Sequence, residues 1–440
     1  MQSSALQEFP KCQVKGSQST GQADRVAAKP VEAALLTGGT DRHYAYGLAL
    51  SLVEEGVCLE VVGGSRVDGP EMHSTPGLKF LNLWKRRGCG AGVLMNGKRL
   101  LAYYVRLIAY AWKARPGIFH ILWNNRIEWF DRTLLMLYYR MLGKKVVLTA
   151  HNVNMAKRDR RDSAWNRLTL KIQYRLCDQI FVHTKKMKDE LIKDFGVPAK
   201  AVTVVPYGIN NAVPPARLTP AEAKHRLGIS RFEKTILFFG NMRPSKGLHD
   251  LLAAFEELLE KDTRYRLIVA GQLIRSYKGY WERTRQALRR VEESRNVIVR
   301  AEYIPDQDIP LYFTAADVLA LPYTEIFQSG VLFLGYSFGL PVVATDVGEL
   351  KKDIVEGRTG FLCSPHDPAG LAAAIEKYFE SDLFREMDSR RQDIRDYAAA
   401  RHSWSKVSAI THAVYRELSG ENPRHETADC ENRGDNLLSA

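Results

Sequence analysis

The stretch TEIFQSGVLFLGYSFGLPVVATDVGEL, residues 324–350, shows how the chain is built. The polar turn Gln328-Ser329-Gly330 precedes the apolar run GVLFLGYSFG, which predicts a helix. Gly339-Leu340-Pro341 then leads into the predicted strand PVVAT (341–345). Apolar strands that alternate with helices are typical of a parallel sheet, so the stretch predicts an α/β fold.

The same alternation occurs in two series along the 440 residues. Predicted strands of the first series are VEAALLTGG (31–39), GIFHILW (117–123), KVVLTAH (145–151), QIFVHT (179–184) and VTVVPYG (202–208). Those of the second are TILFFG (235–240), YRLIVAG (265–271), NVIVR (296–300), DVLALP (317–322) and PVVAT (341–345). Helical patterns lie between them, including one after Asp41, which is placed to cap it. We therefore predict two Rossmann-like, doubly wound parallel sheets facing each other across a cleft.

The proline-rich stretch NNAVPPARLTPAEA (210–223) separates the two series and is typical of a linker. We expect one domain over residues 31–212 and a second over residues 213–395, followed by a helix over residues 396–420. Residues 1–30 and 421–440 are polar and are expected to be disordered.

Charge is distributed unevenly between the two halves. Residues 1–212 contain 32 Lys and Arg against 17 Asp and Glu, whereas the remainder contains 31 against 33. A basic half suggests an anionic partner, such as a membrane surface, a phosphorylated substrate or nucleic acid, although a basic surface that only confers solubility is the alternative.

Other sequence features bound the class of protein. No apolar run reaches the roughly 18 residues that a spanning helix needs, and the N-terminus lacks the apolar segment of a secretory signal. The six cysteines are scattered without a CxxC pair, which argues against a disulfide framework or a zinc site. We expect a cytoplasmic protein.

Basic and glycine residues follow the strands, where ligands of open α/β sheets bind. In LFFGNMRPSKGLHDLL, Arg243 and Lys246 stand between a strand and a helix, which suits a diphosphate better than a merely solvated loop. Gly38-Gly39 end the first strand and allow close approach of a phosphate or sugar. His151 ends another strand and is either a donor or acid/base group or a structural hydrogen-bonding residue.

The turn of residues 324–331 offers a second binding element. Gly330 permits a ligand close to the backbone, and the first-turn N–H groups of the following helix attract an anion. Glu325 either accepts hydrogen bonds from sugar hydroxyls or is a surface carboxylate.

Asp306-Gln307-Asp308 has the DxD spacing of some metal sites. It immediately precedes the predicted helix IPLYFTAA, where Asp favours capping, so we expect capping and no bound metal.

Together these segments resemble the nucleotide-sugar-dependent glycosyltransferases of the GT-B fold, in particular the group 1 (GT4-like) family, over roughly residues 31–420. FFGNMRPSKGLHDLLAAF is similar to that family's donor-phosphate loop, and YIPDQDIPLYFTAADVLALPY to the segment leading to its donor site. GLPVVATDVGELKKDIVEGRTGFLCSPHDPAGLAAAI resembles its closing segment. HSWSKVSAITHAVYREL is similar to its last helix, which crosses back to the first domain.

The resemblance implies roles for individual residues. Arg243 and Lys246 would hold the donor diphosphate, and the loop Phe327, Gln328, Ser329, Gly330 and Val331 would offer backbone amides to the donor. His151 would line the catalytic cleft near the transferred sugar, and Gly38 and Gly39 would lie near the donor phosphates and the acceptor. The implied enzyme is a metal-independent, retaining hexosyltransferase without a cofactor, whose nucleotide-sugar is a co-substrate.

One part of the family pattern is missing. The family usually has two Glu residues eight positions apart, which would fall here at Ile326 and Leu334. Glu325 lies one position before the first and is a catalytic candidate from a shifted turn. Nothing replaces the second, which in the family usually grips the nucleotide ribose.

The basic first domain is the expected acceptor side. KRLLAYYVRLIAYAWKAR (98–115) and WFDRTLLMLYYRMLGKK (129–145) mix cations with aromatic and aliphatic residues. Such helices lie in a membrane interface or are helices of the α/β sheet with cationic ends. We expect a saccharide acceptor, lipid-linked, and peripheral contact with the anionic inner face of the cell membrane, as in surface-polysaccharide assembly.

Four rival readings remain to be weighed. A catalytically inactive relative that binds a saccharide or serves as a partner subunit would explain the missing acidic pair. A GT-B epimerase is disfavoured by the closing segment. Nucleic-acid binding lacks a recognition motif, and a dehydrogenase would need GxGxxG.

Overall fold

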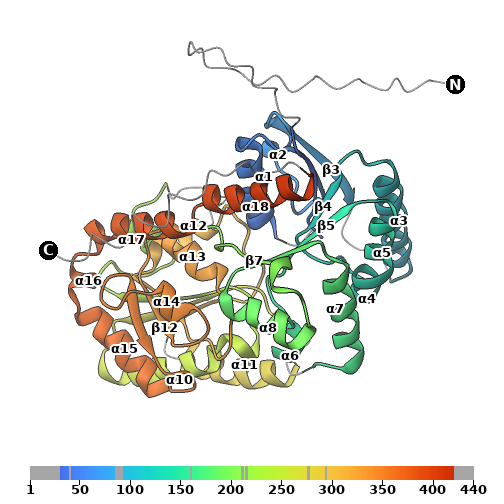
Figure 1. Cartoon of the computed structure of the whole chain (residues 1–440). Helices are drawn as coiled ribbons and strands as arrows, with labels where there is room; N and C mark the ends of the chain where they lie inside the picture. Colours follow the sequence, from blue (N-terminus) through green and yellow to red (C-terminus); the bar gives the residue numbers. More distant parts are fainter. Residues whose placement is uncertain are drawn as a thin grey trace, which may run out of the picture.

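The computed structural model describes residues 30–38, 41–84, 93–158, 161–209, 213, 217–274, 278–292 and 295–420. It contains two parallel sheets, which lie side by side in Figure 1. The first has β1 (Glu32–Leu36), β2 (Cys58–Gly64), β3 (Leu78–Trp84), β4 (Ile118–Ile121), β5 (Lys145–Thr149), β6 (Gln179–Val182) and β7 (Val202–Val204). The second has β8 (Lys234–Phe239), β9 (Tyr265–Ala270), β10 (Val297–Arg300), β11 (Val318–Leu321), β12 (Val342–Thr345) and β13 (Gly360–Cys363).

Both sheets are doubly wound, as predicted. The strand orders are β3-β2-β1-β4-β5-β6-β7 and β10-β9-β8-β11-β12-β13, so in each sheet successive strands are added first to one side of the first strand and then to the other. The predicted tails, Gly39 and part of the linker lie outside the described residues.

The helices fill the connections between strands. Those of the first half are α1 (Arg42–Glu54), α2 (Pro70–Ser74), α3 (Val93–Lys113), α4 (Glu128–Phe130), the π-helix η1 (Asp131–Leu135), α5 (Met136–Met141), α6 (Met155–Arg158), α7 (Ala164–Leu176), α8 (Lys185–Phe195) and η2 (Ala199–Ala201). Those of the second are α9 (Pro220–Arg226), η3 (Pro244–Lys246), α10 (Leu248–Lys261), α11 (Lys278–Glu292), α12 (Ile309–Ala315), α13 (Gly330–Ser337), α14 (Leu350–Asp353), α15 (Pro368–Glu380), α16 (Asp382–Arg385), α17 (Met387–His402) and α18 (Trp404–Leu418). As predicted, Asp41 caps α1, and its carboxylate accepts from Tyr44 N at 3.2 Å.

The first sheet separates two hydrophobic cores. Alternate residues of β1 point to opposite faces, so Ala33 and Leu35 join one core whereas Ala34 and Leu36 join the other. Buried side chains of α1 and α18 complete the first of these cores, and those of α3, η1, α5, α7 and α8 complete the second. The second sheet and its helices share one large core.

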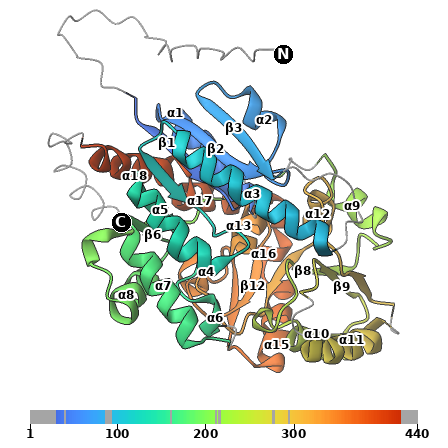
Figure 2. The ribbon, with the colours of Figure 1, turned by 90° about the vertical axis from the view of Figure 1, so that its right-hand side faces the viewer.

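Helix α18 returns to the first domain and lies along α1 (Figures 1 and 2). A Cβ on Gly47 would lie 2.1 Å from the Trp404 ring, so α1 has room for this ring only because residue 47 is glycine. The Trp404 indole donates to Ile209 O at 2.8 Å, and Ser51 Oγ bonds Ser408 Oγ at 2.8 Å. The end of the chain therefore ties the two halves together.

Candidate active site

The turn after β8 carries the two cations that the sequence singled out. Gly247, at φ +63°, follows η3, and a Cβ at this position would lie 1.6 Å from Pro322 O. The Thr324 N–H also donates to Ser245 O at 3.1 Å. Close backbone approach therefore brings the Arg243–Lys246 turn against the segment that follows β11.

Lys246 lies in a strongly cationic environment. Its Nζ is 3.7 Å from the centroid of the Tyr323 ring. Burial, together with the charges of Arg158 and Arg243, lowers the pKa of Lys246 to about 7. Arg158 belongs to α6 of the first domain, so cations from both domains converge here. The buried Arg243 Nε has no hydrogen-bond partner, which leaves a donor available to an anion.

The N-terminus of α13 adjoins this cationic turn. Ser329 caps α13 by accepting from Leu332 N at 3.3 Å, and its Oγ lies 3.2 Å from Tyr323 OH. Tyr323 thus connects the Lys246 ammonium with the start of the helix. A Cβ on Gly240 would lie 3.3 Å from Val331 Cγ2, so the end of β8 also faces this helix start. Cations and a helix N-terminus together suit a phosphate group.

The loop before α13 has contacts with both domains. Phe327 O accepts from Glu349 N at 3.0 Å, and Lys186 of α8 lies over the Phe327 ring at 5.8 Å. Gln328 Nε2 donates to Asp353 at 3.3 Å, whereas its Oε1 is buried without a partner. That oxygen is an acceptor suited to a ligand hydroxyl.

Glu325 is an exposed side chain. Burial raises the pKa of Glu190 on α8 of the first domain, and the charge of Glu325 adds to this rise, so the loop carries its carboxylate near the first domain. Glu325 is therefore a surface carboxylate in this structure, and a catalytic role for it stays a prediction.

His151 lies in an aromatic cage rather than in open solvent. Its ring stacks on Trp123 at a centroid distance of 4.3 Å and 7°, and meets Tyr44 edge-on at 4.6 Å. His151 Nδ1 lies 3.0 Å from His183 Nε2, whereas His151 Nε2 is buried without a partner. Burial and the neighbouring His183 hold the pKa of His151 well below its usual value, so the imidazole is neutral at pH 7. It can exchange one hydrogen bond with a ligand, but it is not a cationic acid.

Tyr207 lies between His151 and α13. Its ring lies 6.2 Å from His151 and stacks on Phe333 of α13 at 5.5 Å. A Cβ on Gly330 would lie 3.0 Å from Tyr207 OH. The structure therefore brings both His151 and Gly330 close to Tyr207.

Gly38 borders a recess in the first domain. It has φ +58°, and a Cβ there would lie 2.7 Å from Trp123 O and 2.8 Å from Asn124 O. The recess is also lined by Asn125 and Asp131. Asp131 accepts from Tyr104 OH at 3.0 Å and Asn125 Nδ2 at 3.1 Å, while burial raises its pKa to about 6. Asp131 thus lines the recess and is held in place by hydrogen bonds to Tyr104 and Asn125.

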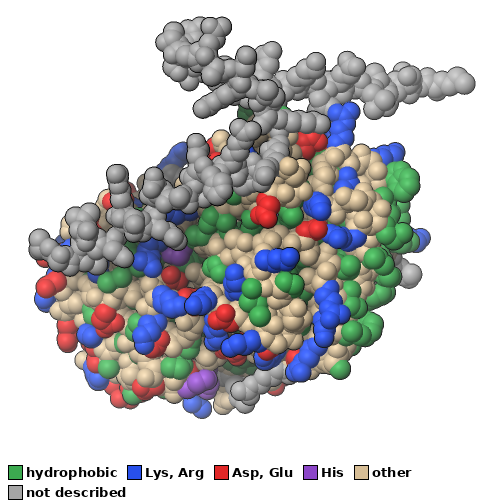
Figure 3. Space-filling model, in the orientation of Figure 1, with side chains coloured by type: hydrophobic (Ala, Val, Ile, Leu, Met, Phe, Trp, Pro, Cys, Tyr) green, Lys and Arg blue, Asp and Glu red, His purple; other side chains and the backbone are tan. Residues whose placement is uncertain are grey.

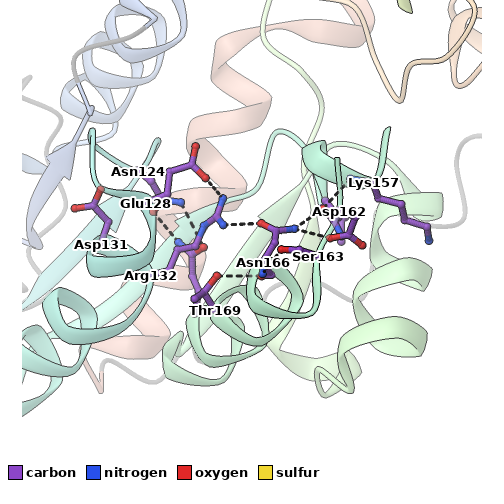
Figure 4. Close-up of polar contacts among 12 residues, drawn as sticks. Asn124, Glu128, Asp131, Arg132, Lys157, Asp162, Ser163, Asn166 and Thr169 are labelled. Carbon is purple, nitrogen blue, oxygen red and sulfur yellow. Dashed lines mark hydrogen bonds and ion pairs between the residues drawn. The ribbon is translucent and has the colours of Figure 1, made fainter. Parts of the chain in front are cut away.

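Figure 4 shows a polar network that fixes the segment after His151. Asn166 of α7 accepts from Arg132 Nη1 at 2.9 Å, and its amide donates to Asp162 at 2.7 Å and to Asn154 at 3.0 Å. Asn154 also accepts from Lys157 N at 3.1 Å. These bonds join η1, α6 and α7 and so position the helix that carries Arg158.

The capping role predicted for the DxD segment is wrong. Asp308 occupies the N-cap position of α12 but makes no side-chain capping bond. Asp306 instead pairs with Arg42 at 3.3 Å and His43 at 3.3 Å, both at the start of α1. Its carboxylate therefore joins the two domains, between the start of α1 and the start of α12. Within the described part of the chain, no group of three or more His, Cys, Asp or Glu is placed to hold a metal ion.

The two positions of the missing acidic pair face inward. Leu334 is buried in the core of the second domain and Ile326 packs against the same core. An ionised carboxylate at Leu334 would need a partner that this apolar environment does not offer.

Sequence reasoning missed several residues of the cleft. Tyr44, Trp123 and Tyr207 carried no signal, since aromatic residues beside strands are usually core. His183 follows a strand as His151 does, and this shared placement was a usable signal. Arg158 stood in a run of charged residues without any distinguishing spacing.

Comparisons with known proteins agree with this geometry. Residues 38–213 match the family model described as Glycosyltransferase Family 4, and residues 233–381 match that of Glycosyl transferases group 1. A D-inositol 3-phosphate glycosyltransferase of Corynebacterium jeikeium is 26% identical over 401 residues, which cover 87% of this chain and 93% of the relative. The enzyme of that name from Pseudarthrobacter chlorophenolicus is 30% identical over 251 residues, or 55% of this chain and 57% of the relative.

Solved structures show the same fold. Sucrose-phosphate synthase from Thermosynechococcus elongatus superposes with a TM-score of 0.68 at 18% identity, over 89% of this chain and 100% of that one. Anabaena HepE in complex with UDP and glucose gives 0.67 at 17% identity, with the same coverage.

Proposed function

Since the chain belongs to the group 1, GT4-like glycosyltransferases and has their GT-B fold, we propose that it transfers a hexose-type sugar from a nucleotide-sugar to a saccharide acceptor. One observation carries the proposal. Arg243, Lys246 and Arg158 converge near the N-terminus of α13, and burial together with the charges of Arg158 and Arg243 lowers the pKa of Lys246 to about 7. A donor diphosphate supplies the negative charge that this site favours.

The proposed reaction uses these cations on the leaving group. The bond between the anomeric carbon and the diphosphate oxygen breaks, and a bond to an acceptor hydroxyl oxygen forms on the same face. The hydroxyl proton passes to the departing phosphate, so configuration is retained without a protein nucleophile. Arg243, Lys246 and the helix dipole stabilise the developing charge without a metal or another cofactor.

His151 has a positioning part in this scheme. Its neutral imidazole exchanges a hydrogen bond with the transferred sugar through the unpartnered Nε2. Glu325 and Gln328 meet sugar hydroxyls from the loop side.

The proposed acceptor is a lipid-linked saccharide of cell-surface polysaccharide or glycolipid synthesis, met at the inner face of the cell membrane. The basic first domain supports this choice. The names of the inositol-phosphate relatives make D-inositol 3-phosphate the rival acceptor for the same assay.

A second candidate function is that of a catalytically inactive relative that binds a saccharide or serves as a partner subunit. Leu334 and Ile326 favour it, because the acidic pair that usually grips the donor is replaced by core side chains.

Calorimetric titration with UDP, GDP, ADP and their common sugar conjugates tests the proposal. UDP comes first, because HepE was solved with it. We expect one nucleotide to bind, and binding to be lost in Arg243→Ala/Lys246→Ala but kept in Arg289→Ala/Arg290→Ala, which removes two exposed cations of α11. A folded wild type that binds none of the panel supports the inactive relative instead.

A further inference from the structure

Exposed apolar side chains gather on one side of the first domain. Among the described residues, fifteen large hydrophobic side chains are exposed, and eleven of these fall between Leu101 and Leu168. We call ten of the eleven the apolar face: Leu101, Val105, Ile108, Trp112, Trp129, Leu134, Leu137, Met141, Trp165 and Leu168. They lie on α3, α4, η1, α5 and α7, which cover the same side of the first sheet (Figure 2).

Helix α3 shows that this exposure is not a by-product of core packing. Its exposed residues 101, 105, 108 and 112 follow helical spacing along one side. Its buried residues 103, 104, 107 and 111 follow the same spacing along the other side and enter the core. The helix is therefore apolar on two sides, and the fold uses only one of them.

The elements of the apolar face are joined into one surface. Tyr138 OH of α5 donates to Ile108 O of α3 at 3.2 Å, and Arg132 of η1 bonds Asn166 of α7. Figure 3 shows apolar side chains along the right-hand edge, where α3 and α5 lie in Figure 1, with Lys and Arg beside them. A broad apolar surface of this kind marks an interaction site.

The charge around the apolar face identifies its partner. Residues 98–176 contain 17 Lys and Arg against 4 Asp and Glu. Lys113, the residue after Trp112 on α3, and Lys171, on the same helix α7 as Trp165, are exposed cations. Tryptophan with flanking cations suits the headgroup level of an anionic bilayer, whereas a second copy would bring like charges together.

We propose that the apolar face lies against an anionic lipid bilayer, with Trp112, Trp129 and Trp165 at headgroup level. None of the helices that the structure describes is long and apolar enough to cross a bilayer, so the contact is with one leaflet.

The apolar face also adjoins the cleft. Trp123, which stacks on His151, is followed within the same short connection by the exposed Trp129 of α4. A lipid-linked saccharide held in the leaflet would reach the His151 side along residues 123–129. This inference rests on the proposed acceptor class for its purpose, but membrane contact can be measured without sugar transfer.

Flotation of the full chain with vesicles tests the proposal. The vesicles are phosphatidylcholine alone or mixed with phosphatidylglycerol, at low and high salt. We expect binding only to the anionic vesicles, weakened by salt. Trp112→Ser should reduce affinity about tenfold, and Lys113→Gln/Lys171→Gln about fivefold for each charge.

Matched variants on the second domain serve as controls. Phe232 is as exposed as Trp112, at 71% against 70%, so Phe232→Ser should leave vesicle binding unchanged. Arg289→Gln/Arg290→Gln, the control for Lys113→Gln/Lys171→Gln, should also leave vesicle binding unchanged. Absence of binding to the anionic vesicles, or equal losses in Trp112→Ser and Phe232→Ser, overturns the proposal. The proposal is also overturned if the wild type does not bind vesicles but associates with itself, and if Trp112→Ser abolishes this self-association. Nucleotide titration of the same samples reports separately on the proposed transferase.

Discussion

Lys246 is the residue on which the proposed donor site depends most. Its ammonium lies over the Tyr323 ring in a partly buried setting, and Arg158 and Arg243 add like charge. Each of these influences lowers the pKa of the group, and together they bring it to about 7. An incoming diphosphate reverses the electrostatic balance and raises the pKa again.

Nucleotide binding should therefore be linked to proton uptake. About half of the Lys246 side chains are neutral at pH 7, so binding of a nucleoside diphosphate takes up about half a proton. Affinity should fall as pH rises above 7, by at most about tenfold per pH unit. Calorimetry in two buffers of different ionisation enthalpy measures the uptake. Lys246→Met should lose it, and uptake that persists in this variant would contradict the assignment.

At the residue scale, the sequence could indicate chemistry but not environment. The flanking glycines and the preceding strand made Arg243 and Lys246 visible, because strand ends of open sheets meet at one edge. The neutral state of His151 was not predictable, since it depends on Trp123, Tyr44 and His183, which come from three different connections. The segment of Asp306 was expected to cap the helix that follows it, because its partner Arg42 in α1 lies 264 residues away in the sequence.

At the scale of elements, helix α18 has the clearest structural role. Tyr415 OH bonds the buried His120 Nδ1 at 2.7 Å, and His120 Nε2 lies 2.7 Å from Thr149 Oγ1. Burial holds the pKa of His120 down to about 3, so the imidazole is neutral and both ring nitrogens need hydrogen-bond partners.

Tyr415→Phe should lower the free energy of unfolding by about 1–2 kcal/mol, because it leaves His120 Nδ1 buried without its partner. Tyr397→Phe is the matched control, since the Tyr397 hydroxyl is buried without a partner, and its loss should cost less than about 0.5 kcal/mol. Urea denaturation measures both. Equal losses in the two variants would show that the bond to α18 contributes nothing.

Strands β1 and β4–β12 were predictable because they are continuous apolar runs bounded by glycine or polar turns. Strands β2, β3 and β13 were not. In β2, Glu60 interrupts the apolar run, and β3 is an edge strand whose residues are only partly buried, so neither has the pattern of a central strand. Strand β13 is short and has little strand pattern of its own, and its pairing with β12 determines its structure.

At the scale of the whole molecule, Asp306 joins the two domains across the cleft. Its contacts with His43 and Arg42 hold the pKa of the carboxyl below its usual value. An ion pair in this partly exposed setting contributes about 1 kcal/mol at most. That is enough to shift an equilibrium between open and closed domains about fivefold.

Asp306→Asn should therefore favour the open arrangement, with a larger radius of gyration in X-ray scattering and little change in melting temperature. Asp308→Asn, two residues further along, should leave the scattering unchanged, because Asp308 makes no capping bond. Indistinguishable scattering curves for wild type and Asp306→Asn would rule out the pair as a domain latch.

We propose that the donor diphosphate binds where cations of the two domains meet, and that sugar transfer depends on this binding. Release of nucleoside diphosphate from the nucleotide-sugar selected by calorimetry, with acceptor present, tests it most directly. We predict turnover by the wild type, at least about 100-fold less in Arg243→Gln/Lys246→Gln, and wild-type turnover in Arg289→Gln/Arg290→Gln. Undiminished turnover in Arg243→Gln/Lys246→Gln would contradict the account.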